Sequence, residues 1–287
     1  MHANINGKLI PNKNAAISLF DHGLLYGDGV FETLRTYNGK LFMIDEHLNR
    51  LYLSAKQMKL VIPIPKEQMK KEIQKTVAKN KLIEAYIRLT VTRGIGELGL
   101  LKKCKAQYFI IAKEFTPYNS RLYDGVKLII SKYSRTLPKI KSINFLPNIL
   151  AAHEAKEKKA FDALFSSNDE ITECTTSNFY IVKNNTLLTS PHVLDGITRS
   201  IVLKLAKKYF QIEIRKITKI DLIDCDECFL TNTSMEIVPV IAIDNKIIGT
   251  GKAGKKTKQL HADFKEFVQR NYSGCEINAK KRKSPND

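Results

Sequence analysis

The sequence predicts a mixed α/β (α+β) protein with two domains, and three observations carry this prediction. Asparagine–glycine pairs lie between short apolar stretches, as they do in tight hairpins. Several longer stretches repeat apolar residues with the period of a helix. The regular spacing of apolar residues is lost over 116–124, where we expect an interdomain linker. The predicted parts are a small N-terminal α/β domain (1–115), a linker (116–128), a large cofactor-binding domain (129–275) and a basic, disordered tail (276–287).

The N-terminal elements begin with two predicted hairpins. Their turns are Asn6-Gly7 and Asn38-Gly39, and this residue pair accepts the positive φ angles of a two-residue turn. After the second hairpin, Leu48, Leu51 and Ala55 share one face of a predicted helix. The expected elements that follow the hairpins are helices over 46–58 and 66–79 and a strand over 86–92.

The C-terminal elements alternate irregularly between strands and helices, which argues against a doubly wound parallel sheet. The expected strands cover 126–131, 178–182, 186–189, 227–231 and 238–243. The expected helices cover 148–159 and 198–210, and the expected hairpin turns lie at 184–185 and 244–245.

The formal net charge of +18 is the most unusual bulk property. A surface of this charge attracts polyanions, so a basic nucleic-acid-binding protein is a remote alternative. The lysines are, however, spread along the chain, and no nucleic-acid motif is present, so we expect no specific nucleic-acid partner. The dense lysine clusters at 252–258 and 280–283 are interpreted as solvated tail.

No stretch reaches the roughly 18 apolar residues of a membrane-spanning helix, and the first residues do not form a signal peptide. We therefore expect a cytoplasmic protein with no membrane partner. The five cysteines show no disulfide spacing. Cys225 and Cys228 lack a second pair of ligands, so we expect them to pack at the start of a strand and predict no metal site.

Four separate segments supply groups that a phosphorylated pyridine aldehyde needs. Lys141 lies in a mixed apolar stretch that can desolvate its amine, as Schiff-base formation requires. Glu173 precedes a run of hydroxyls, and an acid there can keep a pyridine nitrogen protonated. Gly196 leads into a helix whose first N–H groups suit a phosphate, and 231–236 is a second hydroxyl-rich loop. Each segment alone is equally consistent with an ordinary loop or helix start.

Together, these segments resemble the class IV aminotransferases, which include branched-chain aminotransferases, D-amino acid aminotransferases and aminodeoxychorismate lyases. The resemblance runs from Ile5 to about Leu260 and is carried by 20–32, 47–51, 141–144, 173–180 and 196–199. It implies a two-domain fold type IV enzyme whose larger domain is β-barrel-like. It also implies a homodimer in which loops of the partner complete the pocket.

The resemblance implies pyridoxal 5'-phosphate as the cofactor, with Lys141 as its Schiff-base lysine and as the catalytic base. The residues implied to bind the cofactor are Arg50, Lys141, Glu173, Thr176, Ser177, Asn178, Ile197, Thr198 and Thr233. The residues implied to face the substrate are Tyr26, Phe31, Thr33, Tyr86, Arg88 and Ser234.

Tyr86 and Arg88 share one face of a strand and offer a substrate carboxylate a hydroxyl and a cation, which resembles the branched-chain enzymes. Arg35 and Arg93 are the alternative cations. Thr33 stands where those enzymes have glycine, and Phe145 where a tyrosine is common. We expect a transaminase that acts on branched-chain L-amino acids or D-amino acids, with a 2-oxo acid such as 2-oxoglutarate as acceptor. The alternative is a 4-amino-4-deoxychorismate lyase that releases pyruvate.

Overall fold

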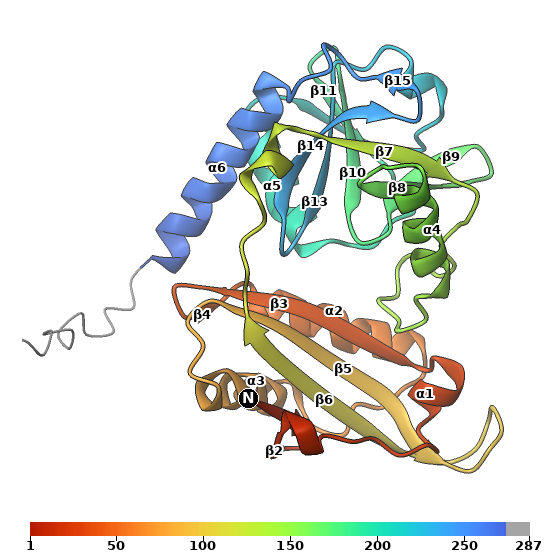
Figure 1. Ribbon diagram of the computed structural model, residues 1–287, viewed down its shortest axis with the longest axis vertical. Coiled ribbons are helices and arrows are strands. Elements are labelled where there is room, and N and C mark those ends of the chain that lie inside the picture. The colour runs from red at the N-terminus through yellow and green to blue at the C-terminus, as the bar shows by residue number, and fades with distance from the viewer. Residues whose placement is uncertain (274–287) are drawn as a thin grey trace, which may run out of the picture.

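Two β-sheets organise the structure, a computed structural model that describes residues 1–273 (Figure 1). The predicted tail over 276–287 lies outside the described residues. The first sheet has six strands, in the order β2 (Lys8–Pro11), β1 (His2–Ile5), β6 (Cys104–Glu114), β5 (Ala85–Gly96), β3 (Gly29–Tyr37) and β4 (Lys40–Leu41). Strand β7 (Val126–Ser131) begins inside the range predicted for the linker and belongs to the second sheet.

The two hairpin turns predicted in the N-terminal part are confirmed by their backbone angles. Asn6 and Gly7 have φ values of 51° and 84°, and Asn38 and Gly39 have values of 51° and 79°. Each pair joins two antiparallel neighbours, β1 with β2 and β3 with β4. Two consecutive left-handed residues match the twist of the strands they connect, which explains why these local signals were reliable.

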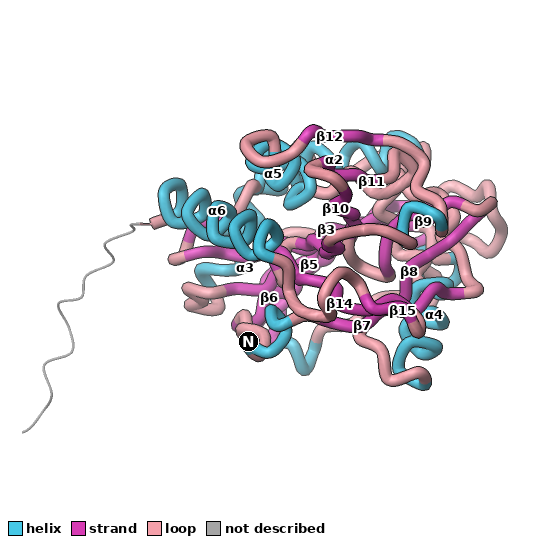
Figure 2. The backbone as a smooth tube through the Cα atoms, turned by 90° about the horizontal axis from the view of Figure 1, so that it is seen from above, coloured by secondary structure: helices cyan, strands magenta, loops and turns pink. Residues whose placement is uncertain are grey.

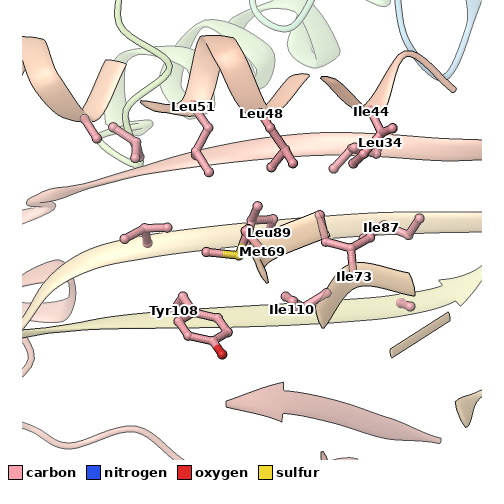
Figure 3. Packing of buried hydrophobic residues seen from close by; sticks show 14 of the residues in the cluster. Leu34, Ile44, Leu48, Leu51, Met69, Ile73, Ile87, Leu89, Tyr108 and Ile110 are labelled. Carbon is pink, nitrogen blue, oxygen red and sulfur yellow. The ribbon is translucent and has the colours of Figure 1, made fainter. Parts of the chain in front are cut away.

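Helices α2 (Ile44–Gln57) and α3 (Lys66–Lys79) pack on the first sheet. Both were predicted, although α2 begins at Ile44 rather than Glu46. Leu48 and Leu51 point from α2 toward the sheet (Figure 3) and belong to one buried core with Leu34 and Ile87. Burial of each such side chain is worth roughly 1.5–3 kcal/mol, so this core holds β3 and β5 firmly in place. The short helix α1 (His22–Tyr26) was not predicted.

The second sheet is barrel-like, as expected. Its path runs β12 (Gln211–Ile214), β11 (Thr186–Thr189), β10 (Asn178–Lys183), β13 (Glu227–Asn232), β14 (Glu236–Ile243), β7, β8 (Asp162–Ser167) and β9 (Glu170–Cys174), and β15 (Lys246–Ile247) pairs with β14. Strand β9 pairs back onto β10 through Glu173 and Asn178, which closes the path from β10 to β9 into a ring. This closure brings two of the predicted site residues side by side.

Three helices lie around the second sheet, with α6 (Lys255–Tyr272) and α4 (Leu146–Glu157) on opposite sides of the molecule in Figure 2. The third, α5 (Ile197–Ala206), ends before the predicted Phe210 because the chain turns after Ala206. The interpretation of 252–258 as solvated tail was wrong, since 255–258 form the first turn of α6. Leu260 and Phe264, one turn apart, anchor α6 in the core. Within residues 1–273, short 3₁₀ helices cover η1 (Asn12–Asn14), η2 (Ser120–Asp124) and η3 (Ile220–Leu222).

A buried polar cluster joins the two sheets. Tyr37 on β3 donates a hydrogen bond to Glu236 on β14, with 2.9 Å between the oxygens. His261 on α6 lies 2.9 Å from the other carboxylate oxygen, and a guanidinium nitrogen of Arg35 lies 3.6 Å from Glu236. Glu236 ends the predicted 231–236 loop and begins β14, so the cluster fixes this loop relative to β3. Within residues 1–273, no helix is long and apolar enough to span a bilayer.

Candidate active site

A cavity of about 400 Å³ lies where the two sheets face each other. All predicted site residues except Tyr26 line it. From the first sheet and its helix these are Phe31, Thr33, Arg50, Tyr86 and Arg88; from the second part of the chain they are Lys141, Glu173, Thr176, Ser177, Asn178, Ile197, Thr198, Thr233 and Ser234. Segments that are far apart in the sequence therefore meet at one site.

Lys141 lies on the loop between β7 and α4, and its backbone is fixed on both sides. Its carbonyl accepts a hydrogen bond from the Phe31 N–H at 2.9 Å, and Ile143 N–H donates to the Gly29 carbonyl at 3.0 Å. The loop is thus attached to the edge of β3, and the Lys141 amine lies 4.7 Å from the centroid of the Phe31 ring. Burial, followed by the charge of Arg50, lowers the pKa of Lys141 to about 7.

Glu173 lies on β9, deep in the same cavity, and three neighbours donate hydrogen bonds to it. These are the Leu194 N–H at 3.2 Å, the Asn178 side-chain amide at 3.2 Å and the Arg135 guanidinium at 2.5 Å. Burial raises the pKa of Glu173, and the charge of Arg135 is the strongest influence that opposes this rise. A buried carboxyl with this many donors is held in one orientation.

The N-terminus of α5 forms a small polar recess in the cavity wall. A Cβ atom on Gly196 would lie 2.0 Å from Oδ1 of Asn178, so only glycine allows this close approach. The Thr198 hydroxyl is buried and has no hydrogen-bond partner among residues 1–273. A buried hydroxyl without a hydrogen-bond partner destabilises the folded protein unless a ligand supplies that partner. The first N–H groups of a helix also favour the binding of an anion. The recess therefore fits a phosphate group.

Arg50 reaches the edge of this recess from α2. Its Nε and a terminal nitrogen each lie 2.7 Å from an oxygen of Glu32, and its other terminal nitrogen donates to the Asp195 carbonyl at 3.0 Å. His47 lies 2.7 Å from the same Glu32 carboxylate. Burial alone would raise the pKa of Glu32, but Arg50 and His47 lower it to about 2. Glu32 therefore stays ionised and binds the Arg50 guanidinium through two hydrogen bonds, one to each carboxylate oxygen.

The loop that follows β13 completes the far wall. The Asn232 side-chain oxygen accepts hydrogen bonds from the N–H groups of Ser234, at 3.0 Å, and Met235, at 2.7 Å. This local turn brings Thr233 and Ser234 to the cavity. The Tyr118 hydroxyl lies 3.3 Å from that of Ser234.

On the first sheet, Tyr86 and Arg88 point from the same face of β5, and Thr33 on β3 is the register partner of Arg88. The Arg88 guanidinium lies 3.9 Å from the centroid of the Phe31 ring. In the described part of the chain, Arg88 has no acidic partner. The alternative cations do: Arg35 pairs with Glu84 and Glu236, and Arg93 with Asp28.

Tyr26 does not line the cavity of its own chain. It lies at the end of α1, is partly exposed, and its hydroxyl accepts a hydrogen bond from the Gly99 N–H at 3.0 Å. The role of Tyr26 in facing the substrate therefore stays a prediction.

Three polar cavity residues outside the predicted segments were missed. Arg135 lies six positions before Lys141, but nothing in its own surroundings marks it among the many basic residues. Tyr118 lies in the stretch interpreted as linker. Asp162 accepts a hydrogen bond from Thr175 at 2.6 Å, and its burial raises its pKa to about 6. A single acid at the first position of a strand carries no sequence signal for such a role.

Residues 29–243 match the model of the family described as Amino-transferase class IV. This chain belongs to that family. It is therefore an aminotransferase of a pyridoxal-phosphate-dependent family, as the sequence resemblance implied.

Relatives and solved structures agree with this assignment. A protein of Methanocaldococcus jannaschii that carries the name of a branched-chain-amino-acid aminotransferase is 42% identical over 275 residues, which cover 92% of this chain and 95% of the relative. A D-alanine aminotransferase of Listeria monocytogenes is 34% identical and covers 93% of this chain and 96% of its own length. The structure of a branched-chain amino acid aminotransferase from T.th. with pyridoxamine 5'-phosphate superposes with a TM-score of 0.88, at 30% identity and 93% coverage of both chains.

Proposed function

We propose that this aminotransferase binds pyridoxal 5'-phosphate through Lys141 and transfers an amino group between a branched-chain L-amino acid or a D-amino acid and a 2-oxo acid such as 2-oxoglutarate. The observation that carries the proposal is the Lys141 amine, which lines the cavity with a pKa of about 7. An ordinary lysine is protonated at neutral pH, whereas an amine with this pKa is nucleophilic and basic there.

The cavity residues fit the three parts of the proposed cofactor. Lys141 would hold the aldehyde carbon, Glu173 the ring nitrogen, and the recess with Thr198 the phosphate. The unsatisfied Thr198 hydroxyl supports this fit, because it lacks a partner that a phosphate oxygen would provide. Arg50, Thr233 and the N–H groups at the start of α5 would complete the phosphate site, with Ile197 contributing its backbone.

The bound cofactor would supply an electron sink for the electron pair that remains on Cα of the amino acid when its proton leaves. Lys141 would take that proton at Nζ and return it to the cofactor side, since its pKa suits both steps near neutral pH. Glu173 would keep a proton on the ring nitrogen. Arg88 and Tyr86, together with Ser234, would orient the substrate carboxylate, and the apolar face of Phe31 would contact its side chain.

The substrate class follows from the relatives as well as from the cavity. Relatives are named as enzymes of branched-chain amino acids and of D-alanine, so both classes belong in the first test. Purified protein loaded with pyridoxal phosphate is mixed with L-leucine or with D-alanine while the visible absorption band is followed. Loss of the band with either amino acid, and its recovery with 2-oxoglutarate, supports the proposal; a band that neither amino acid changes contradicts it.

A second candidate is 4-amino-4-deoxychorismate lyase. Thr33 lines the cavity and stands where the branched-chain enzymes have glycine, and a threonine there resembles the lyases and some D-amino acid enzymes. The lyase would use the same lysine but release pyruvate without a 2-oxo acid acceptor. Pyruvate formed from aminodeoxychorismate, together with an unchanged band in leucine and D-alanine, would select this candidate.

We also propose that a second copy of this chain completes the site. Tyr26 lies outside the cavity of its own chain, within an exposed apolar surface at one end of the first sheet. That surface consists of Leu19, Phe20, Leu24, Leu98, Leu100 and Leu101. The two segments that carry these residues are joined by hydrogen bonds from Gly96 to Phe20 and from Gly99 to Tyr26. Large exposed apolar side chains gathered on neighbouring segments are typical of protein interfaces. Light scattering should report a dimer, and Leu100→Asp should produce monomers; a wild-type monomer would contradict the proposal.

A further inference from the structure

Arg135 connects the two residues that the proposed function places at opposite ends of the cofactor ring. One terminal nitrogen donates to the Glu173 carboxylate at 2.5 Å, and the other donates to the Ile140 carbonyl at 2.9 Å. Ile140 is the neighbour of Lys141. One planar guanidinium therefore reaches both the acid and the backbone beside the lysine, and its rigid fork couples their positions.

The loop that carries Arg135 needs such an anchor. It runs from 132 to 145 without a helix or strand, and Leu137 within it has a φ of 53°, in the left-handed region. Ile140 N–H donates to the Leu137 carbonyl at 3.0 Å, which closes a tight turn just before Lys141. The hydrogen bond from Arg135 to the Ile140 carbonyl attaches this turn to the barrel through Glu173.

The charge of Arg135 acts on both residues in the direction that the reaction needs. After burial and Arg50, it contributes to the low pKa of Lys141, and it opposes the rise that burial imposes on the pKa of Glu173. The same cation thus favours a neutral amine and an ionised carboxylate. Arg135 is mostly buried, with a side chain 12% exposed, so solvent screens this effect only weakly.

We propose, on the basis of the proposed function, that Arg135 is a positioning residue that acts through Glu173 and through the backbone of Lys141. The substrate does not need to touch it. Substitution is therefore expected to change kcat and the affinity for the cofactor while the KM for the amino acid changes little.

Three variants test this role: Arg135→Gln removes the charge, Arg135→Lys keeps it, and Lys132→Gln removes a charge from an exposed position of the same loop. A lost charge-assisted hydrogen bond predicts a fall in kcat and a rise in the Kd for pyridoxal phosphate, each about 10-fold or more, in R135Q. R135K is expected to recover most of the loss because it keeps the charge, and K132Q to match the wild type.

A double-mutant cycle with Glu173→Gln separates this role from a purely structural one. If Arg135 acts through Glu173, R135Q should lower kcat by less than about 3-fold in the E173Q background. Equal losses in both backgrounds, or equal losses in R135Q and R135K, would overturn the inference. If the wild-type protein binds the cofactor and R135Q has the same kcat and the same Kd for pyridoxal phosphate, this inference alone is overturned. A wild-type protein with no visible band on addition of pyridoxal phosphate overturns the proposed function as well.

Discussion

The Lys141 amine lies 4.7 Å from the centroid of the Phe31 ring, a position that an aromatic face makes favourable for a cation. A desolvated contact of this kind is worth about 2 kcal/mol and is too weak to keep the amine charged. Burial and the charge of Arg50 prevail and lower the pKa of Lys141 from 10.5 to about 7.

This balance predicts how cofactor loading depends on pH. Only the neutral amine attacks an aldehyde, so the loading rate of the cofactor-free protein should rise with pH and level off above about 7. Stopped-flow absorbance after addition of pyridoxal phosphate measures this rate. A rate that still rises steeply between about pH 8 and pH 10, as for an ordinary lysine, would show that the amine is not desolvated.

The unsatisfied Thr198 hydroxyl predicts opposite effects on stability and on binding. Thr198→Val removes a buried hydroxyl without a protein partner, so the cofactor-free protein should keep or gain stability by up to about 1 kcal/mol. The Kd for pyridoxal phosphate should nevertheless rise about 10-fold, because a hydrogen bond to phosphate is lost.

Thr189 supplies the matched control for this experiment, since its hydroxyl donates to the Phe179 carbonyl at 3.2 Å and does not line the cavity. Thr189→Val should lower the melting temperature and leave the Kd unchanged. Thr198→Val with unaltered cofactor affinity would place the phosphate elsewhere.

Arg88 is the one arginine among the three candidates without an acidic partner in the described residues, which predicts a role in binding a carboxylate. Arg88→Ala should raise the KM for the amino acid about 10- to 100-fold, since a charge-assisted hydrogen bond is lost, and Arg88→Lys should recover part of it. Steady-state kinetics provides the measurement. An unchanged KM in R88A would contradict this role.

The Glu32–Arg50 pair predicts a stability effect with a defined pH dependence. Glu32→Gln should lower the free energy of unfolding by about 3 kcal/mol at pH 7, because it leaves a buried guanidinium without its counter-charge. Since the pKa of Glu32 is lowered from 4.5 to about 2, this contribution is present above pH 4.5 and disappears as the pH falls toward 2.

Urea denaturation measures this difference, and the exposed pair of Asp45 and Lys70 is the control. Asp45→Asn should change stability by less than about 1 kcal/mol, as for other surface ion pairs. Equal losses in E32Q and D45N would contradict the importance of the buried pair.

The parts of the fold that could be predicted depend on local chemistry. The turns at Asn6-Gly7 and Asn38-Gly39 need only two residues with positive φ, and α2 needs only the spacing of Leu48 and Leu51. Each of the four segments is ambiguous by itself, and they were singled out because together, in their order and spacing, they resemble one family. Residues of all four line one cavity.

The features that were missed depend on contacts between distant segments. The pairing of Glu173 with Asn178 closes the barrel, but its register is not encoded in either strand alone. The bond from Arg135 to Glu173 spans 38 positions, and arginine is common in this basic chain. Helix α6 was missed because the lysines at its start were interpreted as a solvated tail, although Leu260 and Phe264 lie one helical turn apart. Tyr26 does not line the cavity of its own chain.

The most direct test of the account is to identify the lysine that binds the cofactor. Protein loaded with pyridoxal phosphate is reduced with borohydride, digested, and analysed by mass spectrometry, with Lys141→Ala as the control. We predict one stable label, on the peptide that contains Lys141, and no stoichiometric label in K141A. A stoichiometric label on another lysine, or equal labelling of K141A, would contradict it.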